Sequence, residues 1–433
     1  MSLRLLFLLA ALVFSWLFAF NSGRDLAYNL AYLLTGILAL SYGWAWNSTR
    51  FVQINRYTRA RRSQVGQFFE ETFEIRNLGR LPKLWLELRD YSTVPFHGVS
   101  RVVNNLQGRN SQRWQVRTLC QQRGHFRLGS MSLHSGDPLG LFSVGHNLSL
   151  TSDLIVYPAT VELNTFQPPI ADLAGGDALS RRTQTLTTNV SGIREYAPGD
   201  SFNRIHWLST ARTGRLMTKE FELDPSADIW IFLDFFHEVD QSLSWQPARP
   251  DVGVFSLTRL RSAGKRQDML ELPPSTSEYG VTIAASAARY FLLRNRAVGM
   301  MWNDGERQVL QTDRGQRQVR KILESLAVSN ANGRMPFDEL LLTDGVRLNR
   351  NDIVIAISPD PRPDWARALR ELRRRGVNSI AVVLDGTTFG GRHSVEPLMH
   401  ELELSAIPTY PVKRGQSIES ALSKTAGWEF RRW

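Results

Sequence analysis

The sequence is poor in cysteine and lacks the common catalytic motifs. Cys120 is the one cysteine among 433 residues, which excludes an intramolecular disulfide and agrees with a reducing compartment. There is no phosphate-binding Gly-x-x-x-x-Gly-Lys-Ser/Thr run, no His-Glu-x-x-His sequence and no paired-cysteine motif, and Ser191-Gly192 does not form a nucleophile elbow. We therefore predict a protein that is not an enzyme, with no catalytic residue, no bound metal and no cofactor.

Acidic residues are fewer than basic ones, 41 against 52, so the formal net charge is +11. Such an excess favours nucleic acid or anionic lipid headgroups as a partner. The chain has no zinc-finger spacing, RNA-recognition signature or long basic helix, so we predict no nucleic-acid binding. Anionic lipid headgroups are the predicted partner, through the arginines of residues 50–62 and the run Arg373-Arg374-Arg375.

Two long apolar runs stand at the N-terminus. Residues 3–20 form the first, and residues 26–46 form the second, which has about the ~20 residues that a membrane-spanning helix needs. We predict two N-terminal transmembrane helices, a hairpin over residues 1–47. A cleaved signal peptide is the alternative for the first run, but the region before it offers only Arg4, shows no clear small-x-small cleavage site and is followed at once by a second run.

Basic residues are distributed unevenly around the second apolar run. The loop before it contains Arg24, which Asp25 balances, whereas several arginines follow it closely. The positive-inside rule therefore predicts that the soluble part of the chain lies in the cytoplasm. The arginines that follow are Arg50, Arg56, Arg59, Arg61 and Arg62.

Residues 48–158 show a hydrophobic period of two. The runs 69–75, 84–88 and 114–119 alternate in this way, and Gly, Asn and Pro turns separate them. Several short strands at this spacing predict an all-β sandwich domain. A metal site at His125 and His134 is an alternative reading of these two histidines, but isolated histidines without a second ligand at defined spacing are more often surface or core residues.

Residues 191–227 are unusually dense in charged, aromatic and turn residues. Ala197-Pro198-Gly199 predicts a break in the chain, Asp200 is placed to N-cap a helix that runs through Ser209, and a strand follows. The apolar side chains expected to face inward are Phe202, Ile205 and Trp207 or Leu208.

The charges of this segment have two interpretations, an internal ion-pair network or a docking surface for a partner. Asp200 with His206 is also a conceivable catalytic pair, but a helix N-cap and a helix-surface histidine are a simpler explanation of the two residues. The candidate partner-docking or interdomain residues are Arg194, Glu195, Tyr196, Gly199, Asp200, Arg204, His206, Trp207, Arg212, Arg215, Lys219 and Glu222.

This segment resembles the signature of the bacterial domain of unknown function 58 family, which has no settled activity. The resemblance implies a protein of the bacterial inner membrane and, as partners, a MoxR-type AAA+ ATPase and often a transglutaminase-like membrane protein. Residues 123–126 and 137–142 resemble segments that precede the signature in that family. The matching signature positions are Arg194, Tyr196, Gly199, Asp200, Arg204, Ile205, Trp207, Ala211, Arg212, Leu216, Lys219 and Glu222.

Strands alternate with helices after a linker over residues 159–190 and the signature segment. This alternation predicts a doubly wound α/β domain with a parallel sheet over residues 228–433. In the same family this region resembles a von Willebrand factor A domain. The predicted strands are 229–235, 297–302, 353–358 and 379–384, and the predicted helices are 281–294, 316–326, 365–374 and 396–402.

The metal site of such a domain is degenerate in this chain. Metal-binding A domains use an Asp-x-Ser-x-Ser loop whose oxygens coordinate Mg²⁺, but here Phe236 and Glu238 follow Asp234 in place of the serines. Ser358 and Asp360 are expected at the same edge of the sheet. We predict that the metal is lost and that Asp234 either caps a helix or pairs with an arginine of the signature. The loop 237–277 is expected to close this site, to contact a partner or to be disordered.

The predicted function is a membrane-anchored scaffold or adaptor that works with a MoxR-type AAA+ ATPase in the assembly or remodelling of envelope or metal-dependent complexes. The alternative is an enzyme or an anionic-ligand receptor that uses Arg194, Asp200, Arg204 and His206.

Overall fold

The computed structural model describes residues 3–164, 166, 190–197, 202, 205–221, 227–247, 272–350 and 352–423. They form two compact units. The first unit contains the N-terminal helices and a β-rich domain, and the second contains an α/β domain and the signature segment. Most of the predicted linker and of the predicted loop 237–277 lies outside the described residues.

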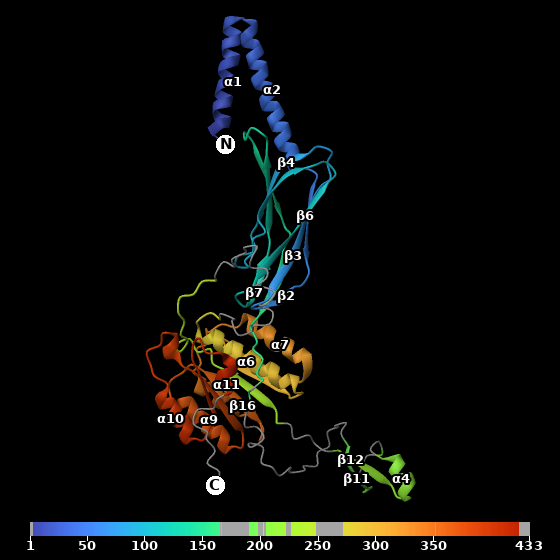
Figure 1. Ribbon diagram of the computed structural model, residues 1–433, viewed down its shortest axis with the longest axis vertical. Coiled ribbons are helices and arrows are strands. Elements are labelled where there is room, and N and C mark those ends of the chain that lie inside the picture. The colour runs from blue at the N-terminus through green and yellow to red at the C-terminus, as the bar shows by residue number, and fades with distance from the viewer. Residues whose placement is uncertain are drawn as a thin grey trace. The chain divides into compact units, whose positions relative to one another are not determined.

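Helices α1 (Leu3–Ser22) and α2 (Asp25–Ser48) are long and apolar enough to cross a membrane, judged by length and composition. Gly23 joins them with a positive φ of 63°, and Figure 1 shows them side by side. The small residues Ala19 and Ala31 are fully buried, which permits close packing of the two backbones. Trp16 Nε1 donates to Thr35 Oγ1 at 3.2 Å across the pair.

The β-rich domain has three sheets, with strand orders β1-β3-β6, β5-β4-β8-β9 and β2-β10-β7. Neighbouring strands are antiparallel except for β2 and β10, which are parallel. The strands are β1 (Val52–Thr58), β2 (Arg62–Gln64), β3 (Phe68–Asn77), β4 (Lys83–Asp90), β5 (Arg101–Leu106), β6 (Ser111–Leu119), β7 (Gly124–Leu128), β8 (Met131–Gly136), β9 (Ser143–Leu148) and β10 (Ser152–Tyr157).

The alternation in the sequence explains the core of this domain. Phe73 and Ile75 lie two apart on β3 and are fully buried, as are Leu86 and Leu88 on β4. All four belong to one hydrophobic cluster, so the sheet that contains β3 packs against the sheet that contains β4. The sequence therefore correctly predicted two apolar N-terminal helices followed by a largely β domain.

The α/β domain is built on a six-stranded sheet of order β15-β14-β13-β16-β17-β18. Its pairs are parallel, except that β15 runs antiparallel to β14. The strands are β13 (Ile229–Leu233), β14 (Val298–Asn303), β15 (Arg307–Asp313), β16 (Ile353–Ser358), β17 (Asn378–Leu384) and β18 (Thr409–Val412). The helices are α6 (Thr276–Leu293), α7 (Gly315–Val328), α8 (Phe337–Gly345), α9 (Asp364–Arg374), α10 (Glu396–Leu404) and α11 (Ile418–Ser423), and a short 3-10 turn, η3, covers Gly386–Phe389.

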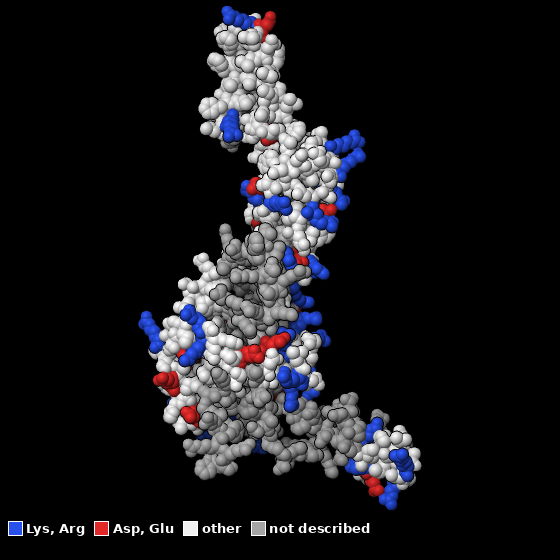
Figure 2. Space-filling view, in the orientation of Figure 1, with Lys and Arg blue, Asp and Glu red and all other residues white. Residues whose placement is uncertain are grey.

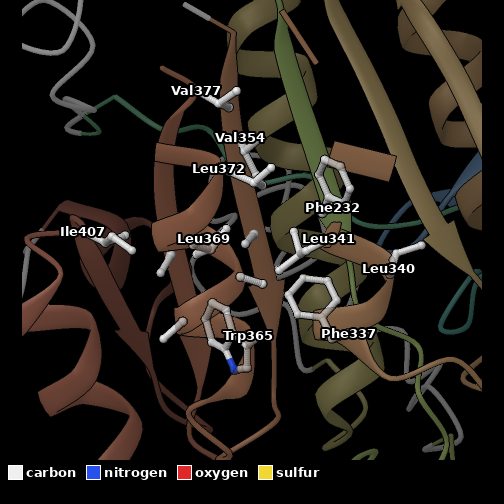
Figure 3. Packing of buried hydrophobic residues seen from close by; sticks show 14 of the residues in the cluster. Phe232, Phe337, Leu340, Leu341, Val354, Trp365, Leu369, Leu372, Val377 and Ile407 are labelled. Carbon is white, nitrogen blue, oxygen red and sulfur yellow. The ribbon is translucent and has the colours of Figure 1, made fainter. Parts of the chain in front are cut away.

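Helices cover both faces of this sheet. Phe232 on β13 belongs to a buried cluster with Phe337 of α8 and Trp365 of α9, as Figure 3 shows. The next residue on the strand, Leu233, points to the other face, where Gly280 of α6 approaches it. A strand buried on both faces reads as a continuous apolar run, which is the pattern that β13 shows.

Some boundaries and elements differ from the sequence prediction. The first strand ends at Leu233 rather than at residue 235, and α6 begins at Thr276 rather than at residue 281. Strand β13 ends where the Asp234 carboxylate accepts the Phe236 amide and turns the chain. Elements β15, β18, α8 and α11 were not predicted.

Candidate functional site

The signature segment forms a small module of two strands and one helix. Strand β11 (Val190–Glu195) pairs antiparallel with β12 (Met217–Phe221), and α4 (Trp207–Thr213) lies between them in the chain. The Tyr196 amide donates to the Leu216 carbonyl at 2.8 Å, which closes the hairpin. Within the predicted site, Gly199, Asp200, Arg204 and Glu222 lie outside the described residues.

The helix of this module begins later than the sequence predicted. The expected helix ran through Ser209 from an N-cap at Asp200, whereas α4 begins at Trp207 and His206 is its N-cap. His206 Nδ1 accepts from the Ser209 amide at 3.2 Å and lies 2.8 Å from Ser209 Oγ. His206 is therefore the N-cap of α4, whereas the sequence predicted a histidine on the surface of the helix.

The apolar side chains of the module do not all face inward. Ile205 is buried, as predicted, but Phe202, Trp207 and Leu208 are 66%, 67% and 70% exposed. A helix of seven residues offers one short apolar stripe, and none of its residues is buried. The prediction that Phe202 and Trp207 or Leu208 turn inward is wrong for this module.

Some charged side chains of the module form internal pairs, and others are exposed as a docking surface would require. Arg215 Nη1 pairs with Glu195 Oε1 at 2.8 Å, and the hydrogen bond and charge of Glu195 raise the pKa of Arg215. Arg194 Nη1 donates to the Glu195 carbonyl at 3.0 Å. Arg212, in the last turn of α4, is exposed, and Lys219 on β12 is half-buried.

The predicted metal positions of the α/β domain do come together at the carboxyl ends of β13 and β16. Ser358 Oγ donates to Asp234 Oδ2 at 2.6 Å and accepts from the Asp360 amide at 2.9 Å. Asp234 Oδ1 accepts from the Phe236 amide at 2.9 Å, so this carboxylate caps a turn rather than a helix. Glu238 lies in the turn that follows Phe236.

The carboxylate of Asp360 is bound by a cation of the same chain. Arg362 Nη2 lies 2.7 Å from Asp360 Oδ2, its Nε lies 2.9 Å from Oδ1, and this hydrogen-bonding raises the pKa of Arg362. The Arg362 guanidinium also stands over the Phe236 ring, 5.5 Å from its centroid. Arg362 therefore supplies positive charge beside Asp360 and acts electrostatically on Asp234.

Asp234 is the most perturbed acid of this edge. Burial raises its pKa to about 7, although the hydrogen bonds from Ser358 and the Phe236 amide oppose the shift and the Asp360 charge adds to it. The group therefore exchanges a proton near neutral pH. Its side chain is almost fully buried, which separates it from solvent.

A buried charge network in the β-rich domain was missed in the sequence. Arg56 Nη2 and Nε bind Glu71 at 2.6 and 2.9 Å, and Arg56 Nη1 lies 3.3 Å from Asp90 Oδ1. His97 Nε2 lies 2.8 Å from Glu71 Oε2, and its Nδ1 lies 2.7 Å from Thr118 Oγ1. The available signal was the acidic Glu71 at an inward-facing position between Phe69 and Phe73 on β3.

The arginines predicted to bind lipid are not grouped at the end of α2. Arg56 is buried in this network, and β1 carries the chain away from α2 at about 3.3 Å per residue, so Arg59, Arg61 and Arg62 follow at the far end of the strand. In the second predicted run, Arg373 donates to the Ser405 carbonyl at 2.7 Å.

The two histidines considered for a metal have ordinary partners. His125 Nε2 lies 3.6 Å from Asp153 Oδ1 on the neighbouring strand, and both side chains are more than half exposed. His134 Nε2 lies 3.0 Å from Ser132 Oγ.

Two solved structures match about a quarter of the chain at low identity. The CARDB domain of the PF1109 protein from Pyrococcus furiosus, in complex with di-metal ions, is 14% identical with a TM-score of 0.19, over 25% of this chain and 90% of that chain. A complex of zinc 2-glycoprotein and prolactin inducible protein from human seminal plasma gives 10% identity and a TM-score of 0.19, over 25% of this chain and 98% of that chain. Similarity at this level carries no argument about function.

Sequence comparisons point to the signature segment. Residues 192–246 match a family described as "Protein of unknown function DUF58". The "Uncharacterized protein YeaD" of Bacillus subtilis (strain 168) is 26% identical over 252 residues, which are 54% of this chain and 59% of the relative's length. The signature segment is therefore similar to the DUF58 family, whose function is unknown, and the chain spans about three fifths of the length of this relative.

Proposed function

We propose that this chain is a membrane-anchored scaffold or adaptor that works with a MoxR-type AAA+ ATPase in the assembly or remodelling of envelope or metal-dependent complexes. The family resemblance supplies this partner, and a transglutaminase-like membrane protein is a further candidate. In this proposal α1 and α2 span the bacterial inner membrane and the rest of the chain lies in the cytoplasm, as the arginines that follow α2 favour.

The observation that carries the proposal is the exposed apolar start of α4. Trp207 and Leu208 are 67% and 70% exposed on a short helix, and the exposed Arg212 lies on its last turn. Tryptophan and arginine are enriched among the residues that dominate protein–protein binding energy. The module therefore has the composition of a docking site for a folded partner.

The chemistry of the α/β domain is compatible with a binding role. In this proposal the domain is von Willebrand factor A-like, and its ligand edge works without a metal. Arg362 binds Asp360, and Ser358 binds Asp234, so internal partners already occupy both carboxylates. This edge of the sheet is therefore suited to a structural or binding role rather than to activation of a water molecule.

The proposal is tested by capture of the purified ATPase on the detergent-solubilised full-length protein. Leu208→Ala and Trp207→Ala are expected to weaken capture by about tenfold or more, since a central hot-spot residue contributes about 2 kcal/mol. Leu404→Ala is the matched control, because Leu404 is 68% exposed on α10 and Leu208 is 70% exposed on α4.

Unchanged capture by both α4 variants, with wild-type melting temperatures, would falsify the docking role. The alternative of an enzyme or an anionic-ligand receptor built on Arg194, Asp200, Arg204 and His206 stays a prediction. It requires His206→Asn, which keeps a capping side chain and removes the imidazole, to abolish turnover or ligand binding.

A further inference from the structure

Three turns meet at the end of the β-rich domain that adjoins α2. The Leu78 amide donates to the Phe51 carbonyl at 2.7 Å, and the Arg109 amide donates to the Gly79 carbonyl at 3.0 Å. These bonds join the segment after α2, the β3–β4 turn and the β5–β6 turn into one surface. Figure 1 shows this end of the domain at the end of α2. The segments are residues 47–52, 77–83 and 106–111.

The surface is held rigidly from inside. Asn77 is fully buried, and its Nδ2 donates to the carbonyls of Leu81 at 2.8 Å and Gln107 at 3.1 Å. Gly108 packs so closely that an added Cβ would stand 2.1 Å from the Arg80 carbonyl oxygen. The backbone from which the side chains of these turns project is therefore held in place.

Large apolar side chains project from all but the last of these turns. Phe51 is 61% exposed, Leu78 is 54% exposed and Leu81 is 55% exposed. Each turn also carries one exposed arginine, and the three segments contain no acidic residue. Figure 2 shows Lys and Arg side chains projecting at the end of the β-rich domain next to the helices. We call these six residues the juxtamembrane platform: Arg50, Phe51, Leu78, Arg80, Leu81 and Arg109.

The platform is attached directly to the end of the apolar helix. The buried Lys83 donates from Nζ to the Asn47 carbonyl in the last turn of α2, which also accepts from the Arg50 amide at 3.2 Å. The Arg50 guanidinium lies over the Trp46 ring, 3.5 Å from its centroid. Because α2 ends at Ser48, the platform begins within one turn of the helix end.

We propose that the juxtamembrane platform binds the headgroup layer of an anionic phospholipid bilayer, with its apolar side chains inserted at the interface and its arginines on the phosphates. This inference rests on the proposed membrane insertion of α1 and α2. Interfacial binding needs apolar side chains beside basic ones, and each basic side chain near an anionic surface strengthens it.

Position and charge select lipid over a protein partner. The platform follows directly after a helix with the length and composition of a membrane span. A bilayer around α2 would therefore place its headgroups next to Phe51. In the described part of the chain, no carboxylate lies within ion-pair distance of Arg50, Arg80 or Arg109, which leaves these charges for phosphate.

The test measures immersion of the platform in lipid in the full-length protein. In a Cys120→Ala background, a fluorophore is attached at Leu81→Cys or, as a matched control, at Tyr91→Cys. Leu81 and Tyr91 are 55% and 56% exposed and lie beyond opposite ends of β4. The protein is reconstituted in phosphatidylcholine vesicles with and without phosphatidylglycerol, and quenching by doxyl-labelled lipid is recorded.

We expect loss of emission at position 81 and none at position 91, with greater quenching in the phosphatidylglycerol vesicles. Salt at about 1 M, where the Debye length is about 3 Å, should reduce the difference between the two lipid compositions. The double variant Arg80→Glu/Arg109→Glu should abolish quenching at position 81. Arg59→Glu/Arg61→Glu makes the same charge change at exposed residues near the far end of β1 and should leave it unchanged.

The proposal that the platform binds lipid is wrong if positions 81 and 91 are quenched equally. It is also wrong if both double variants leave the quenching at position 81 unchanged. A label at Val13→Cys in α1 separates this failure from failure of the anchor. If position 13 is quenched and position 81 is not, the platform is wrong and the anchor stands. If neither is quenched, membrane insertion itself is wrong, and the platform falls with it.

Discussion

The pKa values of two buried carboxylates are shifted in opposite directions because their partners differ. Burial alone would raise the pKa of Glu71, but hydrogen bonds from His97 and Arg56 and the Arg56 charge lower it to about 2. Asp234 accepts hydrogen bonds from neutral donors, a hydroxyl and a backbone amide, and burial raises its pKa to about 7 against these bonds and the Arg362 charge. Glu71 therefore stays ionised at physiological pH, whereas Asp234 changes protonation there.

Asp234→Asn should change the pH dependence of stability. The folded pKa of Asp234 is raised from 3.8 to about 7, so its favourable contribution is complete below about pH 4 and is lost as pH rises towards 7. The free energy of unfolding of wild type minus that of Asp234→Asn should fall between pH 5 and 7 by at most about 1.4 kcal/mol per unit. Thermal unfolding of both proteins in detergent at several pH values measures this difference, and a flat difference contradicts the raised pKa.

Glu71→Gln should destabilise the β-rich domain by about 3–5 kcal/mol, because it leaves the buried Arg56 without its main counter-charge. Glu70→Gln is the control: Glu70 pairs with Arg117 on the surface and should cost less than about 1 kcal/mol. The contribution of Glu71 is present above pH 4.5 and is lost as pH falls towards 2. Equal melting temperatures for the two variants contradict the importance of the buried pair.

At the scale of elements, the short helix α4 depends mainly on its ends. Helix α4 has seven residues and no buried side chain, so packing on an apolar face contributes little to its stability. Its first turn is held by the His206 ring, and its last turn ends at Gly214 in the left-handed conformation, with φ 70°. The orientation of Trp207 and Leu208 therefore depends on the His206 cap, together with the hydrogen bond from the His206 amide to the Met217 carbonyl at 2.8 Å.

His206→Ala should cost about 1 kcal/mol of local stability, which corresponds to about fivefold faster exchange of the α4 amides. Asn is a good N-cap, so His206→Asn should exchange at nearly the wild-type rate. Hydrogen exchange of the Ser209 and Thr210 amides in the full-length protein distinguishes the variants. If alanine and asparagine behave alike, the ring does not cap the helix.

The sequence predicts helices and strands best where a periodic hydrophobic pattern extends over many residues or where a run is fully apolar. The alternation of residues 69–75 and the unbroken run of β13 both identified strands. Helix α8 was missed because Leu340, Leu341 and Leu342 are adjacent and define no face over only nine residues. The start of α4 was misplaced because a preferred cap, Asp200, precedes a histidine that rarely has this role.

The residues of the candidate site were predictable where the strand order of the sheet brings them together. They were not predictable where they meet through a side-chain ion pair. Asp234 follows β13 and Ser358 is the last residue of the neighbouring parallel strand β16, and their contact agrees with the rule that such strand ends share one edge of the sheet. No local pattern shows that Arg362 folds back on Asp360. Similarly, Glu71 and His97 are brought together by the fold across 26 positions.

At the scale of the whole molecule, the distribution of charge matters more than its sum. The loop between α1 and α2 is electrically balanced by Arg24 and Asp25, whereas arginines follow α2 in the sequence. Some of these arginines are committed to internal pairs, as Arg56 is. The positive-inside rule acts on the sequence near the span during insertion, so the later burial of Arg56 does not weaken it.

The proposed topology predicts opposite behaviour for two reporter fusions. A reporter that fluoresces only in the cytoplasm should be active after Trp433, and a phosphatase that works only in the periplasm should be active when inserted at Gly23. The reason is that two spans return the chain to its starting side, and the arginines after α2 set that side as cytoplasmic. Exchange of the two activities would show that the orientation is inverted. If both positions report the same compartment, α1 and α2 do not cross the membrane as a hairpin.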